Sequence, residues 1–98
     1  MAKKGYLVSA YRSINNPDKL AAYAKLAGPA FAKYGAKYLV RGDAAQAYEA
    51  GLKQRIVIVE FESVAKAVEA HDSPEYQAAL KAFDGCAERD LRIVEGLE

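Results

Sequence analysis

Hydrophobic and polar positions divide the chain into four short apolar segments and two longer amphipathic ones. The apolar segments cover residues 5–11, 36–41, 55–61 and 91–94, and they are rich in aromatic and β-branched side chains. Short runs of this composition, bounded by turn-forming residues, are typical of β-strands. We therefore predict four strands.

Between the first two strands, apolar residues recur every three or four positions, which predicts an amphipathic helix of about four turns. Asn16 and Pro17 favour its start, because asparagine caps free amides and proline fits the first turn. Pro29 removes one helical hydrogen bond, so a kink is expected there. Gly35 is expected to end the helix in a left-handed conformation.

The second amphipathic segment begins after Ser63, is interrupted at Pro74 and continues to about Phe83. The elements therefore follow the order β-α-β-β-α-β. With right-handed crossovers, this order predicts an α+β, ferredoxin-like protomer with a four-stranded antiparallel sheet and helices on one face. A chain of 98 residues is expected to form one domain over residues 1–98.

The third strand presents apolar side chains to both faces of this sheet. Alternation places Ile56 and Ile58 on one face, and Val57, Val59 and Phe61 on the other. Two helices cover only one face, and an uncovered apolar sheet would be an adhesive patch on a monomer. We therefore predict an obligate twofold homodimer that packs sheet against sheet.

Charge and composition exclude several classes of function. The 14 basic and 13 acidic residues leave a net charge of +1, with no charge run suited to a nucleic-acid backbone. One cysteine and one histidine exclude an intramolecular disulfide and a structural zinc site within one chain. No segment approaches the ~20 apolar residues that span a bilayer, and no signal peptide is apparent. We expect a cytoplasmic protein without cofactor, metal, nucleic-acid or membrane partner.

Four sequence blocks occur in order over nearly the whole chain: FAKYGAKYLVRG, RIVIVEF, SPEYQAAL and RIVEG. In this combination they resemble the domain-of-unknown-function family 1330 (DUF1330), part of the dimeric α+β barrel superfamily. The resemblance implies a ferredoxin-like protomer that pairs into a barrel. The superfamily includes cofactor-independent monooxygenases, muconolactone isomerase-like enzymes and stress-response barrels, so any activity it implies is an analogy.

The match to the family also marks individual positions. The matching residues are Gly35, Leu39, Arg41, Gly42, Glu60, Phe61, Ser73, Pro74, Glu75, Tyr76, Glu95 and Gly96. Two places depart from the family pattern. Ala70 and His71 stand where large aromatics are usual, and Phe83 stands where an arginine is common. If that arginine holds an anion in the family, this chain has lost it.

Arg41 is the first candidate for ligand binding. A guanidinium at the end of a strand, next to Gly42 and facing the helices, would hold a carboxylate through two hydrogen bonds. The structural alternative is an ion pair with Asp43, Glu60 or Glu95. Both interpretations are open at the level of the sequence.

His71 and Glu60 are the candidates for proton transfer. Histidine is the residue type suited to proton transfer at neutral pH, and His71 is followed by Asp72, which would orient its ring, although an exposed histidine often only complements a helix end. Glu60 interrupts an apolar strand, so it would act as a base if burial raised its pKa, or else pair with Arg41.

Tyrosines are numerous for so small a chain, and Tyr34 and Tyr76 are the expected ligand contacts among them. Cys86 has no visible base or resolving partner and is interpreted as an incidental thiol. The sequence thus favours a pocket for a small anionic or aromatic molecule between sheet and helices, with cofactor-free isomerase or monooxygenase-like chemistry as an extension. The alternative is a non-catalytic structural or stress-associated homodimer.

Overall fold

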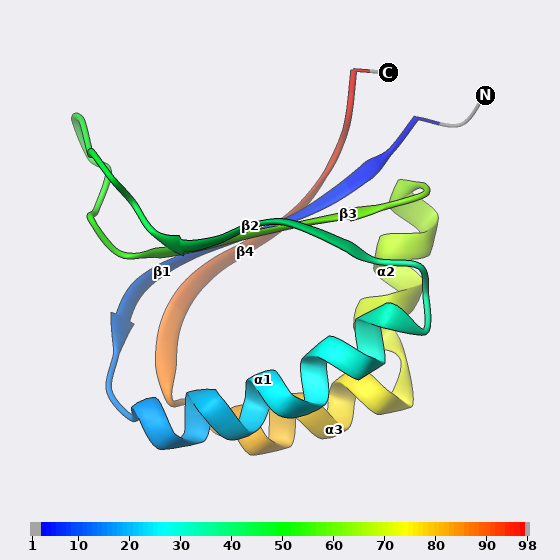
Figure 1. Cartoon of the computed structure of the whole chain (residues 1–98), viewed down its shortest axis with the longest axis horizontal. Helices are drawn as coiled ribbons and strands as arrows, with labels where there is room; N and C mark the ends of the chain where they lie inside the picture. Colours follow the sequence, from blue (N-terminus) through cyan, green and yellow to red (C-terminus); the bar gives the residue numbers. More distant parts are fainter. Residues whose placement is uncertain (1–2, 98) are drawn as a thin grey trace.

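The chain folds into a four-stranded antiparallel sheet with all of its helices on one face (Figure 1). The computed structural model describes residues 3–97. The elements are β1 (Gly5–Ile14), α1 (Pro17–Ala32), β2 (Lys37–Asp43), β3 (Arg55–Phe61), α2 (Val64–Asp72), α3 (Pro74–Phe83) and β4 (Ala87–Glu95). The strand order is β2-β3-β1-β4, and every neighbouring pair is antiparallel. This confirms the predicted α+β, ferredoxin-like fold, with the second helical segment divided into α2 and α3.

The helix boundaries follow from local capping. Asn16 accepts a hydrogen bond from the amide of Lys19 at 3.1 Å, and Pro17 occupies the first position of α1. Ser73 serves two helices: its hydroxyl donates to the Ala70 carbonyl and accepts from the Tyr76 amide, so α2 ends where α3 begins. Gly35 has a φ of 75°, the predicted left-handed conformation, but α1 ends earlier, at Ala32 with Lys33 as its C-cap, so Gly35 lies in the turn into β2.

The core fills the space between the sheet and the helices. Leu7, Val59 and Phe61 contribute from the sheet, and each is at most 2% exposed. Phe31 of α1 is central, because its ring stacks on Tyr76 at 4.5 Å and meets Phe61 edge-on at 5.5 Å. These contacts join α1, α3 and β3 into one apolar layer.

A bulge in β2 changes the predicted alternation of that strand. Tyr38 is paired with Val59 and Arg41 with Val57, while Val40 is paired with Ile58. Strict alternation along this strand would put Tyr38 and Val40 on the same face, but they lie on opposite faces. The extra residue resets the alternation, so that Tyr38 and Arg41 lie together on the helix-covered face.

The other face of the sheet has no helix over it (Figure 1), and we call it the open face. Its residues include Tyr6, Val8, Val40, Ile56, Ile58, Glu60, Arg92 and Val94. Val40 is 43% exposed and Val94 is 52% exposed. Among residues 3–97, no helix has the length and apolar character needed to cross a bilayer.

Candidate functional site

A cleft lies between α1 and the helix-covered face of the sheet. Its cavity volume is about 50 Å³. Leu7, Val57 and Val59 form its floor, and Phe31 and Leu20 of α1 form part of the opposite wall. A concave, largely apolar lining with a few polar groups is typical of small-molecule sites, although this cleft is smaller than most of them.

The polar lining of this cleft is strongly cationic. Arg41, Arg55 and Arg89 all line it, whereas no aspartate or glutamate of residues 3–97 does. None of the ion pairs found within residues 3–97 involves these three arginines. Because the whole chain has a net charge of only +1, this is a local concentration of positive charge.

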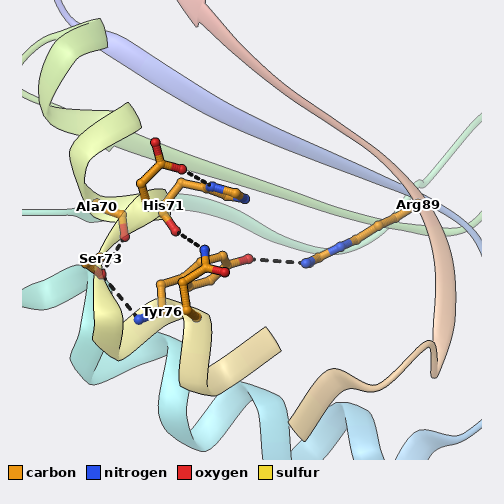
Figure 2. A network of polar contacts seen from close by, with 7 residues as sticks. Ala70, His71, Ser73, Tyr76 and Arg89 are labelled. Atoms are coloured by element: carbon orange, nitrogen blue, oxygen red, sulfur yellow. Dashed lines mark hydrogen bonds and ion pairs between the residues drawn. The ribbon is translucent and has the colours of Figure 1, made fainter. Parts of the chain in front are cut away.

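Arg89 is held in place by tyrosines and aromatic faces. Its Nη1 donates to the hydroxyl oxygens of Tyr11 at 3.3 Å and Tyr23 at 3.2 Å, and its Nη2 donates to Tyr76 at 3.2 Å. The guanidinium also lies 4.3 Å from the ring centre of Phe83. Figure 2 shows Tyr76 reaching from α3 toward Arg89, which extends from β4 to meet its hydroxyl.

Burial and charge determine the protonation of this cluster. Burial raises the pKa of Tyr23, as does the adjacent Tyr76, and Arg89 opposes the increase only in part. Burial acts to lower the pKa of Arg89, but the neighbouring tyrosines outweigh it, and the pKa is raised. At neutral pH the cluster is therefore a fixed cation surrounded by neutral hydroxyls.

Ser9 adds an unused polar group to the floor of the cleft. It lies on β1 between Leu7 and Tyr11 and is only 2% exposed. Its hydroxyl has no hydrogen-bond partner among residues 3–97. Buried hydroxyls are usually paired, so a partner from outside the chain would satisfy this one.

The family model described as "Domain of unknown function (DUF1330)" matches residues 4–97. The chain belongs to the DUF1330 family. Among curated proteins, none matches it.

Solved structures show the same fold in other proteins. A protein of unknown function from Rhodopseudomonas palustris is 22% identical, with a TM-score of 0.75 over 100% of this chain and 85% of its own. SnoaB, a cofactor-independent oxygenase from Streptomyces nogalater, is 10% identical, with a TM-score of 0.66 over 99% and 96%. A dimeric ferredoxin-like protein of unknown function from Thermobifida fusca is 14% identical, with a TM-score of 0.60 over 98% and 93%. At these identities the likeness concerns the fold.

Arg41 of this DUF1330 chain lines the cleft, with its guanidinium carbon 5.0 Å from the ring centre of Tyr38. The predicted ion-pair partners do not meet it: within the described residues, no carboxylate is paired with Arg41. Glu60 lies on the open face, where it accepts a hydrogen bond from Tyr6 at 3.1 Å. The sheet therefore separates Glu60 from Arg41.

The other predicted residues take different positions. Tyr76 belongs to the Arg89 cluster but does not line the cleft, and Tyr34 packs against the core outside the cleft lining. The His71 side chain is 30% exposed, and its Nδ1 is 2.9 Å from Asp72. Its ring centre is 5.1 Å from that of Tyr76, so it contacts the cluster only through this ring.

Arg89 is the main residue that sequence reasoning did not place in the site. The predicted last strand began at residue 91, whereas β4 begins at Ala87. Extending the alternation of Leu91 and Ile93 backward by two residues would have placed Arg89 on the covered face. The same argument applies to Arg55, which alternates with Val57 and Val59 at the start of β3.

Cys86 is buried, and burial raises the pKa of its thiol, in line with the interpretation as an unreactive residue. No group of three or more histidine, cysteine, aspartate or glutamate side chains suited to a metal ion occurs in residues 3–97. Arginines and hydroxyls are the polar groups that line the cleft.

Proposed function

We propose that this DUF1330 protein binds a small carboxylate with an aromatic or apolar body in the cleft between α1 and the sheet. The observation that carries the proposal is the presence of three arginines, and of no acidic residue from the described residues 3–97, in the lining. An anion entering the cleft would supply the missing negative charge, and guanidinium groups match carboxylates well.

The walls of the cleft favour the same type of ligand. Aliphatic side chains of the sheet face the ring of Phe31 across the empty space, and Tyr23 and Tyr38 add further aromatic surface. A flat apolar body would displace water from these walls, while the acid group pairs with arginine. A cavity volume of only about 50 Å³ favours a ligand with one small ring over a polycyclic one.

Cofactor-free chemistry on such a ligand is an extension of this proposal. SnoaB, which shares the fold, is a cofactor-independent oxygenase, and the proposed classes here are isomerisation or oxygenation of an activated carbon acid. Proton abstraction would need an acceptor. Catalytic roles for His71 and Glu60 stay predictions, because neither residue lines the cleft.

Calorimetric titration with benzoate tests the proposed binding, with benzamide as the uncharged comparison. We expect benzoate to bind and benzamide to bind much more weakly. Arg41→Ala should weaken benzoate binding by roughly tenfold to hundredfold, as expected for the loss of a charged hydrogen bond.

Arg92→Ala is the matched control for charge, since Arg92 is exposed on the open face and paired with Asp90. It should leave benzoate binding unchanged. Equal affinity for benzoate and benzamide, or equal effects of the two arginine substitutions, would refute the proposal.

We also propose that the open face joins two copies of the chain. Its central side chains are apolar, with Ile58 lying between Val8 and Val40. Proteins of the same fold from Thermobifida fusca and Bacteroides fragilis are described as dimeric. Sedimentation at micromolar protein should show a dimer; a folded monomer at that concentration would contradict this arrangement.

The alternative function is a structural or stress-associated homodimer without a ligand. The apolar open face favours a dimer in either case, so oligomeric state does not separate the two functions. The benzoate titration does. A purely structural protein would show no saturable binding by benzoate or by other small aromatic acids.

A further inference from the structure

We propose that the cluster formed by Arg89, Tyr11, Tyr23 and Tyr76 binds a second oxygen of the ligand, a phenolic or enolic one, and stabilises it as an anion. This inference rests on the proposed function and specifies its substrate class. The ligand would be a small acid with an ionisable hydroxyl on its ring or on an enol. The proton of that hydroxyl would leave to solvent when the ligand binds.

The first argument is a count of hydrogen-bond donors. Tyr11, Tyr23 and Tyr76 each have one hydroxyl proton, and the oxygens of all three accept from Arg89. Only one of the three protons has an acceptor, in the 2.7 Å bond between Tyr23 and Tyr76. In the described part of the chain, two O–H groups are thus left without an acceptor.

The second argument is burial. Tyr11 is 4% exposed, Tyr23 is 8% exposed and Tyr76 is fully buried, so water reaches these hydroxyls poorly. A buried donor without an acceptor is unfavourable, and the Ser9 hydroxyl in the same cleft is a further example. A ligand oxygen with several lone pairs would satisfy these donors together.

The residues that line the cleft indicate which of the two tyrosines, Tyr23 or Tyr76, donates in the hydrogen bond between them. Tyr11 and Tyr23 line the empty space, whereas Tyr76 lies behind Tyr23. If Tyr76 donates to Tyr23, both Tyr23 and Tyr11 can donate into the cleft. Tyr76 is then a positioning residue, and donation along the chain strengthens the terminal hydrogen bond.

The third argument is electrostatic. Arg89 has no carboxylate partner within residues 3–97, and the acceptors of its bonds are neutral hydroxyls. Its charge is therefore not cancelled by the protein. In a partly buried site, such a cation favours the anionic form of a ligand over the neutral form.

The test uses 4-nitrophenol, whose phenolate absorbs visible light and whose pKa lies near neutrality. Absorbance of the bound probe is recorded across pH at saturating protein. We expect the pKa of the bound probe to fall by about one unit or more, which means at least about tenfold tighter binding of the phenolate than of the phenol.

Four tyrosine substitutions locate the effect. Tyr11→Phe and Tyr23→Phe each remove a donor that faces the cleft, so each should make the fall in pKa smaller. Tyr76→Phe should have a weaker effect, because it removes only the donor behind Tyr23. Tyr48→Phe is the control: Tyr48 is 76% exposed on the β2–β3 connection and should change nothing.

The outcomes of the two titrations distinguish failure of this inference from failure of the proposed function. A bound probe whose pKa is unchanged or raised overturns the inference, and so does a fall that persists in both Tyr11→Phe and Tyr23→Phe. If benzoate binds but 4-nitrophenol does not, the inference fails while the proposed function stands. If neither compound binds, both fail.

Discussion

The same four strands form both faces of the sheet, but the side chains on the two faces differ in how far they are buried. On the covered face, Val59 and Phe61 are at most 1% exposed, whereas Val40 and Val94 on the open face are 43% and 52% exposed. The two faces also differ in how their polar groups are paired. The open face pairs Tyr6 with Glu60 and Asp90 with Arg92, whereas three arginines and several hydroxyls of the cleft have no acidic partner within residues 3–97.

This difference assigns the two faces different roles. A face with apolar side chains at its centre is suited to another protein surface, since docking would remove that apolar area from water. A face with a packed core and unpaired donors is suited to a small acceptor-rich ligand. The sheet thus separates an assembly surface from a binding cleft.

The largest expected effect is on the covered face. Phe31→Ala should lower the free energy of unfolding by about 3–5 kcal/mol, because it removes a buried ring and leaves a cavity. Urea denaturation followed by circular dichroism measures the loss. Val94→Ala on the open face should lower the free energy of unfolding far less. Similar losses in the two variants would show that the two faces are packed alike.

Ile58→Asp tests the open face. Ile58 lies between Val8 and Val40, so an aspartate there would place unpaired charge at the centre of the proposed dimer contact. Sedimentation should show monomers where the parent protein is dimeric. Benzoate binding should persist, because Ile58 does not line the cleft. A dimer that tolerates this charge would require a different interface.

High pH should destabilise the protein through its buried tyrosines. Burial is the main cause that raises the pKa of Tyr11, Tyr23 and Tyr38. Such groups stabilise the fold fully below the unfolded tyrosine pKa of about 10, and this stabilisation is lost as pH rises through the folded-state pKa.

Melting temperature should therefore fall as pH rises above about 10. The fall should be shallower in Tyr38→Phe, while Tyr48→Phe, at an exposed position, should follow the parent protein. Tyrosinate absorbance, followed in parallel, should show part of the tyrosine population ionising only as the protein unfolds. Free ionisation of every tyrosine in the folded state would contradict this assignment.

The smallest effect should come from the paired charges of the open face. Arg92→Ala removes an exposed ion pair with Asp90, and such pairs contribute little in water. We expect no measurable change in urea denaturation. A clear loss of stability or a shift toward monomer would show that this pair takes part in the dimer contact.

The sequence predicted most of the fold because the relevant signals are local. The caps at Asn16 and Ser63, the break at Pro74 and the left-handed turn at Gly35 each depend on a few neighbouring residues. Alternation in β3 likewise showed that both faces of the sheet are apolar, which left one face open once the helices were placed.

The candidate site was predicted only in part. Arg41 was expected to face the helices, and it does so because a bulge in β2 places it on the same face as Tyr38. Arg89 was not expected there, because the polar residues at the start of β4 hide the strand pattern. The strand begins at Ala87, where it pairs with Ile14 at the end of β1, and this long-range pairing is not visible in the local sequence.

By itself, then, the sequence determined the order of the elements, their caps and the two-faced apolar sheet, since these follow from periodicity and short-range hydrogen bonding. Only the tertiary structure decided which polar groups meet. Tyr11, Tyr23, Tyr76 and Arg89 come from β1, α1, α3 and β4, and their hydroxyls and guanidinium converge because the helices pack on that face. Whether each charge finds a partner depends on this packing, which no local pattern encodes.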